Sequence, residues 1–128
     1  MKGVVRILML IAAVTVIVGC AGMSDVKHGL DTGEGIAQVV NCSESQARQI
    51  AMDVLNAHFK HVSDDNGRIF AKTVDTVFGL TFEPLAANLT RITAVSKRTL
   101  ATHIYTTMSE HGFFEEFAEK LNKEVGRQ

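Results

Sequence analysis

Two histidines in the middle of the chain have the residue type and spacing that best fit a metal site. His58 and His61 are three positions apart, and Asp64 and Asp65 follow them closely. Imidazole nitrogens and carboxylate oxygens are ordinary ligands of a tetrahedral Zn²⁺ ion. A histidine pair without a cysteine or a third spaced histidine is a weak signal, and it fits a solvated helix–strand junction equally well. Metal binding through His58 and His61 is therefore a secondary hypothesis.

The other polar side chains do not indicate catalysis. Glu115 and Glu116 are neighbours in sequence, and neighbours on a helix do not face each other. Serines 43, 45 and 109 stand at the starts of predicted helices, where capping explains them. The sequence contains no nucleophile elbow, phosphate loop or dinucleotide fingerprint. We therefore expect a protein that is not an enzyme.

The first nineteen residues have the zones of a bacterial export signal. Lys2 and Arg6 provide a cationic start, an apolar run extends from Ile7 to Val18, and small Gly19 precedes Cys20. The apolar run is shorter than the roughly 20 residues that a membrane-spanning helix needs. A cleaved signal peptide therefore fits this segment better than a permanent anchor.

The tetrapeptide Ile17-Val18-Gly19-Cys20 resembles the lipobox of bacterial lipoproteins. The resemblance implies cleavage between Gly19 and Cys20, and a covalent lipid on the Cys20 thiol as the only attached group. Several acyl chains together hold a protein stably on a bilayer. Ala21 stands where an Asp would favour the inner membrane. The resemblance thus implies an outer-membrane, periplasm-facing protein in preference to one on the inner membrane or a Gram-positive cell membrane.

Charge and cysteine content exclude further classes of function. The chain has 13 basic and 14 acidic residues and a net charge of −1. Removal of the signal takes Lys2 and Arg6 away and leaves a more acidic chain, without the basic surface that nucleic-acid binding requires. With Cys20 lipidated, Cys42 has no intrachain partner, so we expect it to be a small buried side chain.

The mature chain is expected to consist of a tether and one domain. Residues 20–35 are rich in glycine and alternating charge, with little apolar content, which predicts a flexible tether. Residues 36–128 suit a single small domain. Residues 36–40 predict a strand, and Ser43 with Gln46 has the form of a capping box. The helix that follows extends to about Phe59 and has one apolar face, formed by Ala47, Ile50, Ala51, Val54 and Leu55.

Extended segments follow this helix. Asn66-Gly67 is a strong hairpin signal, and Pro84 is expected to end the third of these segments. Residues 99–108 fit a strand or a helix, and we favour an extended first half. A helix is predicted from Ser109 onward on an apolar stripe that includes Phe113, Phe114 and Phe117. The predicted strands are residues 60–63, 68–74, 77–83 and 89–97.

The element order β-α-β-β-β-β-α predicts an α+β fold. Successive strands joined by short turns imply a single antiparallel meander sheet of about four to five strands. The two amphipathic helices have to bury their apolar stripes on one face of this sheet. The opposite face would then be exposed to solvent or bind a partner, and it would carry Arg68, Lys72 and Arg91.

The order resembles an uncharacterised family of small bacterial lipoproteins, each a lipobox followed by one such domain. The resemblance extends from Val39 to about Leu121 and rests on Gly67-Arg68-Ile69, Phe82-Glu83-Pro84-Leu85 and Asn88-Leu89-Thr90. At the level of fold only, the chain is also similar to accessory lipoproteins of outer-membrane barrel assembly. Likeness of fold does not transfer function.

Three functions are compatible with these patterns. The favoured one is a membrane-anchored, non-catalytic accessory or scaffold protein of the cell envelope, which engages an envelope protein through its sheet edge or polar sheet face. Phe113, if exposed, would be a further contact, with Arg68, Lys72 and Arg91. The second is a module for a lipid or small apolar ligand, lined by Phe78, Phe82, Phe114 and Met52. Metal binding ranks third.

Overall fold

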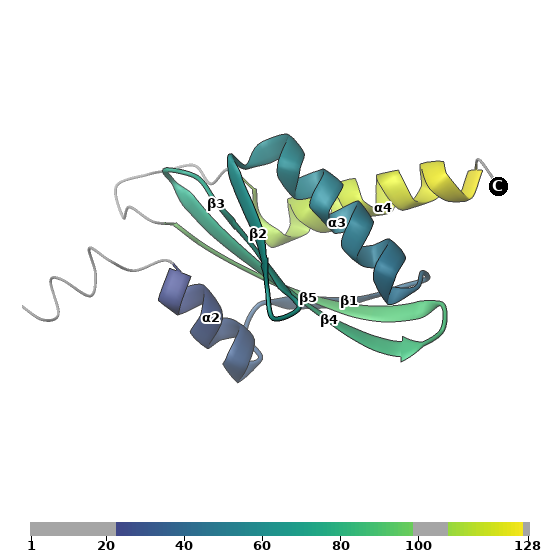
Figure 1. Cartoon of the computed structure of the whole chain (residues 1–128), viewed down its shortest axis with the longest axis horizontal. Helices are drawn as coiled ribbons and strands as arrows, with labels where there is room; N and C mark the ends of the chain where they lie inside the picture. Colours follow the sequence, from purple (N-terminus) through teal and green to yellow (C-terminus); the bar gives the residue numbers. More distant parts are fainter. Residues whose placement is uncertain (1–22, 99–107, 127–128) are drawn as a thin grey trace, which may run out of the picture.

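The computed structural model of the protein describes residues 23–98 and 108–126. Three helices and five strands make up this part of the chain (Figure 1). In chain order they are α2 (Met23–Thr32), β1 (Ile36–Val40), α3 (Glu44–His58), β2 (His61–Asp65), β3 (Arg68–Lys72), β4 (Thr76–Ala86), β5 (Leu89–Arg98) and α4 (Glu110–Gly126). Gly19 and Cys20 lie outside the described residues. So does most of the ambiguous segment, of which only Met108 is described, and it is buried.

The five strands form one antiparallel sheet in the order β1-β5-β4-β3-β2. Strands β2 to β5 are a meander, and β1 pairs with β5 so that Ile36 lies opposite Ala94 and Val40 opposite Thr90. The predicted α+β class, with an antiparallel sheet and two helices on one face, is confirmed. Helices α3 and α4 cover that face (Figure 1).

An aromatic cluster fills the space between the sheet and these two helices. Phe78 of β4 is fully buried, and its ring lies 6.0 Å from that of Phe59 and 5.5 Å from that of Phe113. Phe113 in turn contacts Phe114 and Phe117 on α4. Aromatic pairs at such tilted geometries contribute beyond the area that they bury. The cluster therefore fixes α4 against the middle of the sheet.

Local signals set the helix and hairpin boundaries largely as predicted. Ser43 is the N-cap of α3 and accepts a hydrogen bond from the Gln46 amide at 3.2 Å. The reciprocal half of the capping box is absent there, because the Gln46 side chain donates to Glu124 on α4. Asn66 and Gly67 both have positive φ, 54° and 85°, as a tight β2–β3 turn of the I′ kind requires.

The expected end of β4 at Pro84 is wrong. The strand continues to Ala86, and its register against β5 shifts between Pro84 and Ala86. A proline cannot donate to the strand ladder, and a bulge is one of the few places in a sheet that tolerates it. The β4–β5 hairpin is therefore longer than the sequence pattern suggests.

The expected tether is also wrong over most of its length, because residues 23–32 form helix α2. This helix packs on the sheet face opposite α3 and α4 (Figure 1). Val26 is fully buried, and Leu30 nearly so. Together with three residues of the sheet they form a second core cluster, which contains Val26, Leu30, Phe70, Val77 and Val95. Helix α2 thus covers part of the second sheet face, which is not fully exposed to solvent.

A glycine in the sheet makes room for α2. Gly79 of β4 lies between Phe70 on β3 and Val95 on β5, on the α2 face. A Cβ atom at Gly79 would clash with Cγ1 of Val26 and lie 3.0 Å from Cδ1 of Leu30. The missing side chain leaves a notch, and Val26 fills it. The absence of a side chain at Gly79 therefore lets helix α2 approach the sheet closely here.

We expect Gly79→Val to displace α2 and to lower the free energy of unfolding by about 1–3 kcal/mol, as overpacking of a core does. Denaturant titration measures the loss. Limited trypsin digestion reports the displacement, because Lys27 on α2 should become a cleavage site in native buffer. Gly126→Ala is the control, since its new Cβ meets nothing within 4 Å. Wild-type stability and an uncut Lys27 in Gly79→Val would contradict the notch.

Candidate functional site

The two edges of the sheet differ in how they are protected against pairing with another strand. The β2 edge carries charged side chains, Asp64 and Asp65, after His61 at its start. The β1 edge has the sequence Ile-Ala-Gln-Val-Val and carries no charge and no proline. Natural proteins usually carry charged residues or proline on an exposed edge strand, because the free backbone N–H and C=O groups of the edge can otherwise pair with another chain. The β1 edge is the less protected one.

A groove of about 500 Å³ runs beside the β1 edge, between this strand and α4. None of its lining residues is charged. On the strand side the consecutive residues 38–41 line it, so the edge of β1 rather than one of its faces forms this wall. On the helix side the lining residues are Phe114, Phe117, Ala118, Leu121, Asn122 and Val125.

Helical spacing explains why α4 presents this wall. Phe114, Phe117, Leu121 and Val125 recur at three- and four-residue steps and share one stripe. The stripe is buried at its start, where Phe114 and Phe117 contact the core, and becomes exposed toward the C-terminus, where Val125 is 58% exposed. Val39 on β1 is 50% exposed. The sequence pattern counts Val125 as part of the buried face, and it contains no signal that the sheet ends before covering it.

The four predicted partner contacts have different outcomes. Phe113 is fully buried in the aromatic cluster, so it is not an exposed docking residue. Phe113 lies four residues, about one helical turn, before Phe117, so both side chains are on the same buried face of α4. Arg68 is bound to Asp31 on α2 at 2.7 Å, and Arg91 to Glu83 at 3.0 Å. Lys72 is exposed on the α2 face.

The two histidines of the predicted metal site point to different sides of the sheet. Nε2 of His58 lies 2.7 and 2.8 Å from the two carboxylate oxygens of Glu116 on α4. His61 lies opposite Lys72, on the face that α2 covers. Among residues 23–98 and 108–126, no group of three or more His, Cys, Asp or Glu is placed to hold a metal ion. The His58 side chain instead links the end of α3 to α4.

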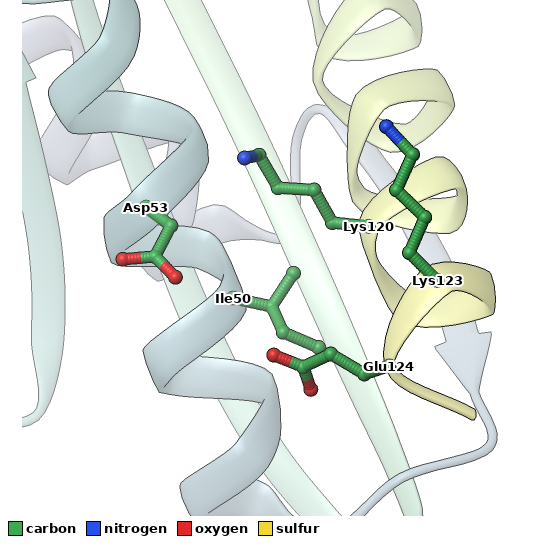
Figure 2. A pocket seen from close by; sticks show the side chains of 5 residues that line it. All are labelled: Ile50, Asp53, Lys120, Lys123 and Glu124. Carbon is green, nitrogen blue, oxygen red and sulfur yellow. The ribbon is translucent and has the colours of Figure 1, made fainter. Parts of the chain in front are cut away.

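A smaller cleft of about 150 Å³ separates α3 from α4. Figure 2 shows Asp53 projecting from α3, and Lys120, Lys123 and Glu124 from α4, around Ile50. The lining therefore contains two acidic and two basic side chains. Balanced charge gives no preference for an anion or a cation, so this cleft is a weaker candidate than the β1–α4 groove.

The residues expected to line an apolar cavity are mostly core. Phe78 is fully buried between other aromatic rings, and Phe82 and Met52 pack against the same cluster. The guanidinium of Arg48 covers the ring of Phe82, 4.7 Å from its centroid. Of the four residues, Phe114 lines the β1–α4 groove. Any apolar ligand would therefore meet the groove rather than the space between sheet and helices.

Cys42 is buried, as the sequence predicts, in the connection between β1 and α3. Its backbone carbonyl accepts a hydrogen bond from the hydroxyl of Thr90 on β5 at 2.9 Å. Burial raises the pKa of the Cys42 thiol, and the negative charge of Glu124 adds to the rise. A thiol with a raised pKa is a poor nucleophile at neutral pH, so Cys42 is structural.

We expect maleimide to label Cys42 slowly in folded Cys20→Ser protein and rapidly after unfolding in guanidinium. Because the folded-state pKa of the thiol is the higher one, its contribution to stability is complete below the unfolded pKa and is lost as the pH rises through the folded pKa. Cys20→Ser with Cys42→Ala should therefore lose less stability above about pH 9 than Cys20→Ser alone. Rapid labelling of the native protein would show that the thiol is accessible.

Among the described residues, no helix combines the length and the apolar character that crossing a bilayer requires. No known family model matches the chain, and neither the curated proteins nor the solved structures contain one that is significantly similar to it. A function for the protein has to be inferred from its own residues, and above all from the uncharged β1 edge and the groove beside it.

Proposed function

We propose that this protein is a lipid-anchored, non-catalytic accessory protein of the bacterial cell envelope. The anchor is a lipid on Cys20, after cleavage of residues 1–19, and it rests on the resemblance of the Ile17–Cys20 tetrapeptide to a lipobox. The same resemblance favours the periplasmic side of the outer membrane. The described domain acts by contact with an envelope protein.

The observation that carries this proposal is the uncharged open edge of β1 beside an uncharged groove. An extended peptide can add to such an edge as a further strand, so that main-chain hydrogen bonds supply affinity and pockets for alternate side chains supply specificity. The groove offers Phe117, Leu121 and Val125 to side chains of the added strand. The partner segment is accordingly extended, uncharged over about five residues, and apolar at alternate positions.

A small apolar ligand in the same groove is the second candidate, because about 500 Å³ lies within the range of ligand pockets. Such pockets usually bury 70–90% or more of a ligand of drug size. Here Val39 on one wall and Val125 on the other remain 50% and 58% exposed, so the groove would leave a ligand partly in water. An added β-strand fits the groove better, because one of its faces can contact the groove while its other face stays in solvent.

The Cys20→Ser substitution tests the anchor. We expect wild-type protein to incorporate radiolabelled palmitate and to fractionate with membranes, and Cys20→Ser to do neither. Several acyl chains contribute about 0.8 kcal/mol for each buried CH₂ group, so their loss should release the domain completely. Cys42→Ser is the matched control and should keep the label. Mass measurement of an unlipidated mature N-terminus would refute the anchor.

The Val39→Lys substitution tests the edge. With a photocrosslinker at position 125, membranes should give one discrete adduct with another protein, and Val39→Lys should abolish it, because a charge on an edge strand opposes pairing. Val39 is half-exposed, so the change should alter stability by no more than about 0.5 kcal/mol. Ser63→Lys places the same charge on the β2 edge and should leave the adduct unchanged.

Two outcomes of this experiment would contradict docking of an envelope partner at β1. One is an adduct that persists in Val39→Lys. The other is an adduct with twice the mass of the chain, which would mean that the edge pairs with a second copy instead.

A further inference from the structure

Helix α2 brings the folded domain close to the position of the proposed lipid. Only Ala21 and Gly22 separate Cys20 from Met23, and the three steps from Cys20 to Met23 reach at most about 11 Å. From Met23 onward the chain is helical and is fixed to the sheet by Val26, which fills the Gly79 notch. If Cys20 carries lipid, as proposed above, no long spacer separates the domain from the bilayer. The end of the sheet next to Met23 must then lie near the lipid headgroups.

That end of the sheet carries a row of basic side chains on the α2 face. His61, Lys72, Val77 and Lys97 lie side by side across β2, β3, β4 and β5, as the registers of the three strand pairs show. Val77 is buried in the cluster that Met23 also contacts. Lys72 and Lys97 are exposed on either side of it. Lys27 on α2 is not part of this row: its ammonium group lies 5.5 Å from the ring centroid of Phe70, and it borders a cleft with Asp65 and Arg68.

Nearby carboxylates reduce this positive charge without cancelling it. Glu34 lies 3.9 Å from the ammonium group of Lys97, and Asp25 is exposed in the first turn of α2. Asp75, in the β3–β4 turn, accepts a hydrogen bond from Thr73 at 2.6 Å. At the opposite end of this face, Arg68 pairs with Asp31 and Arg91 with Glu83, and Asp65 adds a negative charge. The charge is thus distributed along the strands, with its basic end at Met23.

We propose that Lys72 and Lys97 rest on the headgroups of anionic phospholipids and orient the domain on its membrane. Each lysine at an anionic surface strengthens association about fivefold, and the lipid anchor keeps the lysines within reach of the headgroups. Strand β4 then points away from the membrane, and its ten steps from Thr76 to Ala86 place the β4–β5 turn roughly 34 Å farther out. The groove residues 38–41 lie toward this outer end, because Val40 pairs with Thr90.

Headgroup-specific quenching tests this orientation. Acylated protein is reconstituted into vesicles of phosphatidylethanolamine and phosphatidylglycerol that contain a lipid with a spin label on its headgroup. A fluorophore is attached to Val74→Cys in the β3–β4 turn, or to Asn88→Cys in the β4–β5 turn, each combined with Cys42→Ala to remove the free thiol of Cys42. Val74 is 75% exposed, so the label should not disturb the fold. We expect strong quenching at position 74 and background quenching at position 88.

Charge reversal distinguishes the contribution of the lysines to the orientation from that of the lipid anchor. Lys72→Glu with Lys97→Glu should remove most of the difference in quenching between positions 74 and 88, as should replacement of phosphatidylglycerol by phosphatidylcholine. Lys120→Glu with Lys123→Glu changes the net charge equally on α4 and should leave the difference intact. About 1 M salt, which shortens the Debye length to about 3 Å, should act like the Lys72 and Lys97 changes.

The outcomes distinguish this inference from the function on which it rests. Acylated protein that shows equal quenching at positions 74 and 88 would overturn the orientation and leave the anchored accessory function standing. An orientation that is unaffected by reversal of Lys72 and Lys97 would overturn the role of the lysines. Protein without acyl groups on Cys20 would refute the anchor itself.

Discussion

The contact between Val26 and the backbone at Gly79 is the constraint on which the arrangement of this protein depends. Without a side chain at position 79, α2 can approach the sheet and cover Phe70, Val77 and Val95. The sheet is then buried on both faces over its central part, although α3 and α4 cover only one of them. The same contact fixes the position of Met23, the first described residue, on the sheet.

The uneven protection of the two sheet edges follows from this arrangement. Both faces near the centre are covered by helices, so the sheet can gain partners mainly at its edges. Charge protects β2, where Asp64 accepts a hydrogen bond from the Gly67 amide and pairs with Arg48 on α3. Among the described helices, α4 packs beside β1, and its apolar stripe becomes exposed near Val125. Two of the exposed large apolar side chains of the described residues, Val39 and Val125, therefore lie beside this edge.

Sequence patterns were sufficient for the elements that local chemistry determines. The cap at Ser43, the Asn66-Gly67 turn and a strand that includes residues 77–83 each depend on neighbouring residues, and each is confirmed. Helix α2 was missed because its few apolar residues are stable only against the sheet, through a glycine about fifty positions later in the chain. Phe113 was misjudged for the same reason, since only the position of α4 on the sheet decides which side of the stripe is buried. The β1–α4 groove likewise requires the pairing of the first strand with the last.

The proposed lipid on Cys20 and the proposed orientation of the β1 edge would together restrict the partner. A domain at the end of a long tether could search a wide volume, whereas a lipid three positions before Met23 would leave almost no such freedom. The β1 edge would then stay within a few tens of ångströms of the bilayer, near one fixed height. An extended partner segment has to be presented at that height and roughly along β1. A segment that emerges from another protein of the same membrane satisfies both conditions, and it would gain effective concentration from sharing that surface.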